Sequence, residues 1–255
     1  MRNYFVCVFL IIIAIVSASC KKKMESCPIF FPVKPDAKLS FMSYVTTPQN
    51  EILYPFEYFD RRYAYTDTIA ARLIHYYIEK NKKSSFLTDD SCTIWHRTSV
   101  DLSVLALSCG FAYRDSVHLV FWKPVIKVNK GVNTRWSFKI DTTFYGLAAD
   151  GAEHLLHYKF SGSAQYKGWS EVIVPENRTR RLKVRHVQWN PIQYLLYDRT
   201  TNDTLYSHQG TASDYFEPEL GLVRSISDYD VTWKGKPMAS RKSTWELYQV
   251  LIPSQ

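Results

Sequence analysis

Apolar and polar side chains alternate with a period of two in two segments of the second half of the chain. Residues 136–141 read Trp-Ser-Phe-Lys-Ile-Asp, and residues 182–185 read Leu-Lys-Val-Arg. Successive side chains of an extended strand point to opposite faces, so each segment has one apolar and one polar face. This pattern is typical of half-buried strands in an antiparallel sheet.

Further short apolar segments predict additional strands, and polar residues that favour turns separate them, as at 198–203 and 234–237. These segments are 92–99, 103–113, 116–122, 155–161, 169–174, 193–197, 204–208, 221–227 and 245–251. Many short strands joined by polar turns indicate a mainly β protein. We expect a curved antiparallel sheet that forms a partial barrel or a sandwich.

One early segment has the spacing of a helix instead. Ile69, Leu73 and Tyr76 recur every three to four residues, and Thr66 or Asp67 could cap the start. The spacing predicts one amphipathic helix over 67–81.

The first residues have the pattern of an export signal. Arg2 precedes an uninterrupted apolar run from 5 to 16, and three lysines follow at 21–23. A membrane-spanning helix needs about 20 apolar residues, so this run is short for a permanent transmembrane helix. Residues 1–19 are therefore predicted to be a signal peptide.

The segment Ser-Ala-Ser-Cys at 17–20 resembles the lipobox of bacterial lipoproteins, although Ser17 stands where leucine is commonest. The resemblance implies that Cys20 is lipidated after cleavage before it, which would anchor the chain to a membrane. Ordinary secretory cleavage and an uncleaved anchor are the alternatives. Because no acidic pair follows Cys20, we expect an outer-membrane protein that faces the periplasm.

The remainder divides into a tether and one domain. Residues 20–39 hold the lipidated cysteine and a tether with three prolines, and no second linker interrupts residues 40–255. Hydrophobic residues make up 46% of the chain and aromatic residues 15%, which is enough for a sizeable core. We predict a single β-rich domain over 40–255.

The charge of the chain bears on its partners. The formal net charge is +8, and removal of Arg2, the only charged residue of the signal peptide, leaves +7. This excess favours anionic lipid headgroups or acidic glycans as ligands. Nucleic acid is not expected as a partner in the cell envelope, and no motif indicates a cofactor.

The cysteines could form a crosslink, and two histidines lie close enough in the sequence to suggest a metal site. After processing, Cys27, Cys92 and Cys109 remain, and the last two lie in neighbouring predicted strands where a disulfide could join them. His154 and His157 are three apart with a glutamate before both, which is the wrong order for a zinc protease motif. No metal site is predicted.

A further resemblance involves the segments EVIVP at 171–175, LKV at 182–184 and DYFEPELGLV at 214–223. They resemble a family of uncharacterised exported β-rich proteins of Gram-negative bacteria, over about a third of the chain. The turn at 176–178 departs from the usual Ala-Gly. The family implies no activity, and its strand pattern is similar to the half-barrels of periplasmic lipoprotein carriers only at the level of the fold.

The basic segment at 178–186 contains the most suggestive side chains. On a strand, Arg181, Lys183 and Arg185 would project to one face while Leu182 and Val184 face the core. Three such cations could bind phosphates or carboxylates, and the alternative is a solvated face whose charges discourage edge pairing. No catalytic residues are predicted.

Two classes of function remain. We expect a non-catalytic envelope lipoprotein that binds an apolar or amphiphilic ligand, or an envelope protein, with aromatic side chains lining the sheet. Those rings could equally fill a closed interior. The alternative function is a hydrolase or transferase that acts on envelope lipid or glycan.

Overall fold

The computed structural model describes residues 37–69, 72–79, 82–89, 91–112, 117–127, 131–174 and 180–251. The predicted signal peptide, Cys20 and residues 20–36 of the predicted tether lie outside the described residues.

Strands make up most of the described chain. The elements in order are β1 (Lys38–Thr46), β2 (Ile52–Ile69), β3 (Arg72–Glu79), β4 (Lys82–Thr88), β5 (Thr93–Asp101), α2 (Leu102–Ser108), β6 (His118–Lys127), β7 (Arg135–Leu147), β8 (Glu153–Ile173), β9 (Arg181–Asp198), β10 (Asp203–Glu217), β11 (Gly221–Trp233), β12 (Lys236–Pro237) and β13 (Arg241–Leu251).

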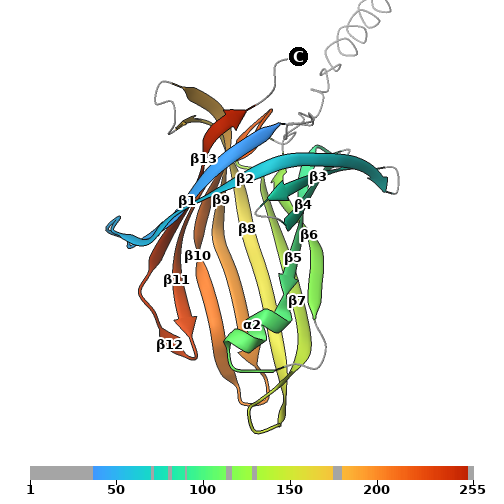
Figure 1. Cartoon of the computed structure of the whole chain (residues 1–255), viewed down its shortest axis with the longest axis vertical. Helices are drawn as coiled ribbons and strands as arrows, with labels where there is room; N and C mark the ends of the chain where they lie inside the picture. Colours follow the sequence, from blue (N-terminus) through green and yellow to red (C-terminus); the bar gives the residue numbers. More distant parts are fainter. Residues whose placement is uncertain are drawn as a thin grey trace, which may run out of the picture.

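All of the strands belong to one antiparallel sheet that curls into a nearly closed barrel (Figure 1). The order of its hydrogen-bonded neighbours is β6-β5-β4-β3-β2-β1-β13-β11-β10-β9-β8-β7, and β12 pairs with β11 beside this path. Sequential strands are neighbours almost throughout, and β1 joins the two halves by pairing with both β2 and β13. The prediction of a mainly β, curved antiparallel sheet is confirmed.

The two ends of the sheet are joined by a side chain. The indole Nε1 of Trp136 on β7 donates to the carbonyl oxygen of Pro124 on β6 at 3.3 Å. Ala112, between α2 and β6 in the chain, forms an isolated antiparallel bridge with Leu147 at the end of β7. These contacts bring the edge strands together without a full backbone ladder.

The alternation of side chains in β9 follows the sequence pattern. Leu182 and Val184 are buried, and they belong to an apolar cluster with Leu39 and Phe41 of β1. Arg181 and Lys183, which alternate with them, are exposed on the outer face. Inward-facing apolar rows of this kind build the core of the barrel.

The predicted helix over 67–81 is wrong, because this segment contains the end of β2 and the whole of β3. Tyr65 and Tyr76 stack across the two strands with ring centroids 4.6 Å apart, and Thr66 Oγ1 lies 2.8 Å from His75 Nδ1. Aromatic and β-branched side chains favour strands when neighbouring strands are available for pairing. Here β2 and β4 flank β3 on its two edges.

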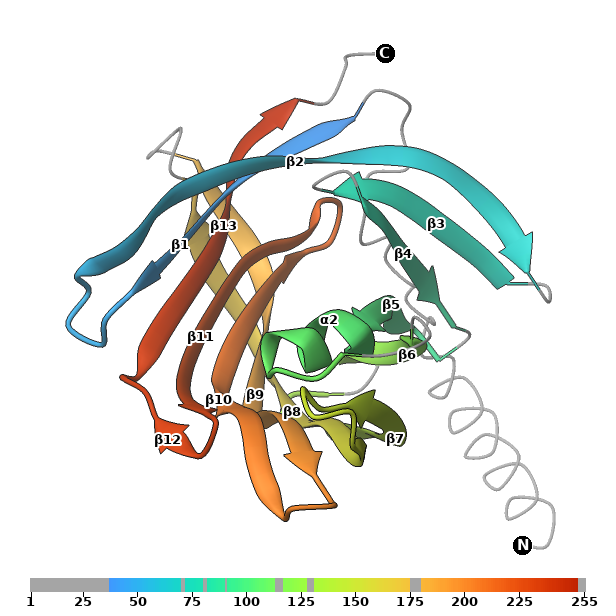
Figure 2. The ribbon, with the colours of Figure 1, turned by 60° about the horizontal axis from the view of Figure 1, so that its bottom comes forward.

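The helix of the described chain is α2, which lies where a strand was predicted over 103–113. Asp101 caps it by accepting hydrogen bonds from the backbone N–H groups of Ser103 and Val104. Gly110, at a φ of 97°, follows the last turn. Leu102 and Ala106 pack on inner-face side chains, so α2 lies inside the ring of strands at one end of the barrel (Figure 2). Among the described residues, no helix has the length and apolar character needed to cross a bilayer.

The predicted disulfide between Cys92 and Cys109 is also wrong. Cys92 is disulfide-bonded, but Cys109 is a free, buried thiol. Cys92 directly precedes β5, whereas Cys109 ends the helix that follows it. A nine-residue strand spans about 30 Å, and cysteine Cα atoms in a disulfide lie within about 7 Å of each other.

Candidate functional site

Aromatic rings from five neighbouring strands form a continuous row on the inner face of the barrel. The row runs from Phe138 on β7 through Phe160, Tyr194 and His208 to Tyr229 on β11, with successive ring centroids 4.7, 4.0, 5.3 and 4.1 Å apart. Tyr194, His208 and Tyr229 keep partial exposure, so solvent reaches the inner face along this row.

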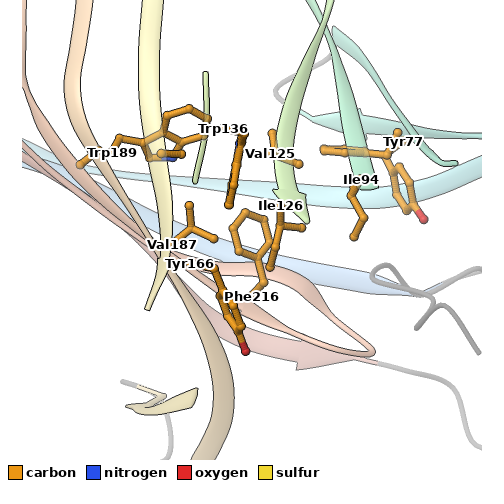
Figure 3. Packing of buried hydrophobic residues seen from close by; sticks show 12 residues of the cluster. Tyr77, Ile94, Val125, Ile126, Trp136, Tyr166, Val187, Trp189 and Phe216 are labelled. Carbon is orange, nitrogen blue, oxygen red and sulfur yellow. The ribbon is translucent and has the colours of Figure 1, made fainter. Parts of the chain in front are cut away.

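The aromatic side chains of β7, β8 and β9 divide between the two faces of the sheet. Trp136, Tyr158, Phe160 and Trp189 are buried inside, whereas Trp169 is 48% exposed on the outer face. Trp136 and Trp189 meet edge to face at 6.2 Å (Figure 3). Most of these rings therefore fill the interior of the barrel and do not line an open groove.

A glycine allows the rings to pack this closely. A Cβ atom on Gly162 would lie 2.9 Å from a ring carbon of Phe138 and 3.2 Å from one of Trp189. The two rings thus cover the backbone of β8 at this residue. They form part of the surroundings of the next side chain, Lys123.

Lys123 of β6 projects into this aromatic interior. Its Nζ lies 5.4 Å from the ring centroid of Trp189, 5.7 Å from that of Phe160 and 5.9 Å from that of Phe138. Within the described chain the ammonium has no ion pair and no hydrogen bond. The residue as a whole is nevertheless half-buried and not fully enclosed.

The energetics of Lys123 indicate an incompletely compensated charge. Removing an ammonium from water costs several kcal/mol. A cation–π contact returns about 0.5–2 kcal/mol, and the three distances from Nζ to the ring centroids are close to the limit of about 6 Å for such contacts. Burial lowers the pKa of Lys123, and the negative charge of Asp214 opposes that shift. An anionic group beside Lys123 would therefore stabilise its charged form.

Asp214 of β10 is held by other partners. Its carboxylate accepts hydrogen bonds from the indole Nε1 of Trp189 at 2.8 Å and from the hydroxyl of Ser225 at 2.6 Å. These bonds fix both carboxylate oxygens. Asp214 attracts Lys123 from a distance without forming an ion pair with it.

A second cation, Arg61 of β2, lies inside the same barrel. It forms an ion pair with Glu79 of β3 at 2.9 Å, and its guanidinium lies over the rings of Phe41, Phe86 and Trp245. Burial, together with the positive charges of Lys123 and Arg61, lowers the pKa of His96 to about 3. His96 is therefore neutral at physiological pH, and its Nε2 lies 3.0 Å from the Ser84 hydroxyl.

The three cations predicted from the sequence lie on the outer face, away from Lys123. Arg181 forms an ion pair with Glu171 at 3.3 Å. Lys183 and Arg185 lie over the exposed ring of Trp169, at 4.9 and 4.6 Å from its centroid. Their shared face is as predicted, and their role in ligand binding stays a prediction.

Histidine and aspartate meet in two separate pairs near the α2 end of β8. His154 Nδ1 lies 2.6 Å from Asp198, and His157 Nε2 bonds to Asp141. Hydrogen bonds from His157 and Lys139 lower the pKa of Asp141 to about 2. Across the described residues, no three histidine, cysteine, aspartate or glutamate side chains converge as metal ligands would.

The sequence contains one overlooked signal for the inner site. Leu119, Phe121 and Lys123 alternate in β6, which places a lysine on the face that carries apolar side chains. The partners of Lys123 come from β7, β8 and β9, so no local pattern brings them together.

Comparison with known proteins gives structural similarities alone. No family model matches the chain, and no curated protein matches it. A Parabacteroides distasonis protein, proposed to be a lipoprotein, has a TM-score of 0.48 at 10% identity, over 89% of this chain and 100% of that one. A Bacteroides fragilis protein with a YmcC-like fold, proposed to be exported, has a TM-score of 0.37 at 10% identity, with the same coverage. Both likenesses have TM-scores below 0.5 and concern the fold alone.

Proposed function

We propose that this chain is a lipid-anchored envelope protein whose barrel binds an anionic amphiphile at Lys123 without chemically changing it. The observation that carries the proposal is an ammonium that lies among aromatic rings inside the barrel and has no ion pair within the described chain. An anionic headgroup would neutralise it. The apolar part of the ligand would contact the neighbouring rings.

The surroundings of Lys123 favour binding over catalysis. Both oxygens of Asp214 already accept hydrogen bonds from Trp189 and Ser225. His96 is neutral, and its Nε2 contacts Ser84. A general acid or base must reach the proton that it transfers, and these two groups are engaged by protein partners.

The anchor would keep such a binding site close to its ligands. Lipidated at Cys20, the protein would sit on a membrane with its domain tethered by the segment up to β1, in the outer membrane and facing the periplasm. Two or more acyl chains hold a protein on a bilayer far more firmly than one. A tethered barrel would thus meet amphiphiles that leave or enter that bilayer.

Lys123→Met tests the proposed function, because it removes the charge and keeps most of the length. We expect octyl phosphate to bind the wild-type protein and to bind the variant at least tenfold more weakly, which corresponds to about 1.4 kcal/mol. Binding would be followed by tryptophan fluorescence, since Trp189 neighbours Lys123.

Lys236→Met is the matched control. Lys236 is exposed on β12, so its replacement removes one positive charge without touching the inner face. The control should bind octyl phosphate like the wild type. Equal affinity of the Lys123 variant and the control would contradict the proposal.

A further inference from the structure

A polar groove of about 630 Å³ lies on the outer face of β7, β8 and β9, behind the Lys123 site. Its lining contains two cations, Arg135 and Lys167, and three amides, Gln165, Gln188 and Asn190. Ser137 and Ser163 add hydroxyl groups, and no carboxylate lines it. The groove includes the point at which the register between β8 and β9 shifts, between Gly162 and Ala164.

The polar groups of the groove are available to a ligand. Among the described residues, Arg135 and Lys167 make no ion pair or hydrogen bond. The amides of Gln188 and Asn190 likewise have no protein partner in the described chain, and Gln165 uses its Nε2 to reach Asn133 at 3.0 Å. An amide both donates and accepts, which suits ligands rich in hydroxyl groups.

The groove is also part of a longer surface. A smaller groove of about 320 Å³ shares Ser137 and Ser163 with it and adds Ser161 and Lys139, whose charge is paired with Asp141 at 3.0 Å. In the other direction, Lys167 is followed on β8 by Trp169, over which Lys183 and Arg185 lie. From residue 161 to 167 the strand spans about 20 Å, enough for an oligosaccharide.

We propose that this outer groove binds an anionic saccharide. The amides and serines would contact the sugar hydroxyls, while Arg135 and Lys167 would bind carboxylate or phosphate groups. Gln165 and Lys167 project from within the long strand β8, Gln188 and Asn190 from within β9, and Arg135 is the first residue of β7. Side chains on strands are held in place more firmly before a ligand arrives than side chains on loops. This site is independent of Lys123, which lies on the opposite face of the sheet.

Calorimetry on the full lipoprotein tests the proposal with hexagalacturonate as the anionic probe and maltohexaose as its neutral counterpart. We expect hexagalacturonate to bind, and maltohexaose to bind at least tenfold more weakly. The double variant Arg135→Gln/Lys167→Gln should lose at least tenfold in affinity for hexagalacturonate. Lys234→Gln/Lys236→Gln, which removes the same charge from the β11–β12 hairpin, should bind like the wild type.

Equal losses in the two double variants would overturn the proposal, since they would show a general effect of charge. Vesicles containing phosphatidylglycerol separate the two sources of anionic groups. Binding of the vesicles through Arg135 and Lys167 without binding of hexagalacturonate would mean a lipid headgroup site and would also overturn it. Lys123→Met should bind hexagalacturonate normally, so failure of one proposal leaves the other intact.

Discussion

Lys123 and His96 face each other as register partners of β6 and β5 on the inner face of the barrel. Both are basic groups in a poorly hydrated place, and they respond differently. His96 gives up its proton, because its pKa falls to about 3. Burial also lowers the pKa of Lys123, but its intrinsic pKa is much higher, so an anionic ligand could hold it in the charged form more easily than it could His96.

The lowered pKa of His96 predicts an acid-sensitive contribution to stability. The unfolded chain binds a proton near pH 6.5 and the folded protein only near pH 3, so the contribution is fully present above pH 6.5 and declines toward pH 3. At pH 5 the loss is about 2 kcal/mol. His96→Gln should therefore lose less stability than the wild type between pH 7 and pH 5, measured by urea unfolding.

Between pH 7 and pH 8 the free energies of unfolding of the wild type and the variant should change with pH in the same way, because His96 is mostly neutral there in both the folded and the unfolded state. This range is the internal control for any general loss of stability in the variant. Identical pH dependence of the two proteins between pH 7 and pH 5 would show that His96 takes up its proton as readily in the folded barrel as in the unfolded chain.

At the scale of elements, α2 shows how a short helix is fixed by its ends and by one face. Seven residues are too few for a stable isolated helix. Leu102 and Ala106 compensate by packing against Phe121, Phe144 and other inner-face side chains. The cap at Asp101 satisfies two backbone N–H groups that would otherwise lack partners at the start of the helix.

Asp101→Ala should destabilise the protein by about 0.5–2 kcal/mol, because the cap is lost. Asp101→Asn should stay near the wild type, since asparagine caps about as well as aspartate. Thermal unfolding of the two variants measures the difference. An alanine variant as stable as the asparagine variant would mean that packing alone fixes the start of α2.

At the scale of the molecule, one sheet presents two different surfaces. The inner face carries rings around a cation without an ion pair in the described chain, and the outer face of β7–β9 carries amides, hydroxyls and basic side chains. The nearly closed barrel separates them. The proposed lipid anchor at Cys20 would decide which ligands these two surfaces meet.

Cys20→Ser should abolish fatty-acid labelling and leave the protein uncut or released from membranes, because a serine lacks the thiol that is acylated. Ser19→Ala is the control, since it keeps a small residue before Cys20, and its labelling should persist. Labelling and membrane fractionation in the native host provide the measurement. Label retained by the Cys20 variant would rule out a lipid anchor at this position.

Local patterns in the sequence were enough to predict the fold class and the two faces of individual strands. In β9, Leu182 and Val184 point inward and Arg181 and Lys183 outward, because alternation along a strand depends only on neighbouring residues. The same reasoning failed over 67–81. Helical and extended conformations compete there, and pairing of β3 with β2 and β4 decides between them.

The sequence by itself therefore predicts an N-terminal export signal and determines a chain of amphipathic strands. Only the tertiary structure decided that the sheet closes far enough to bring Lys123 of β6 among the rings of Phe138, Phe160 and Trp189. It also decided that β5 holds Cys92 and Cys109 apart. The physical reason is that such contacts join residues far apart in the chain, whereas sequence periodicity reports only on near neighbours.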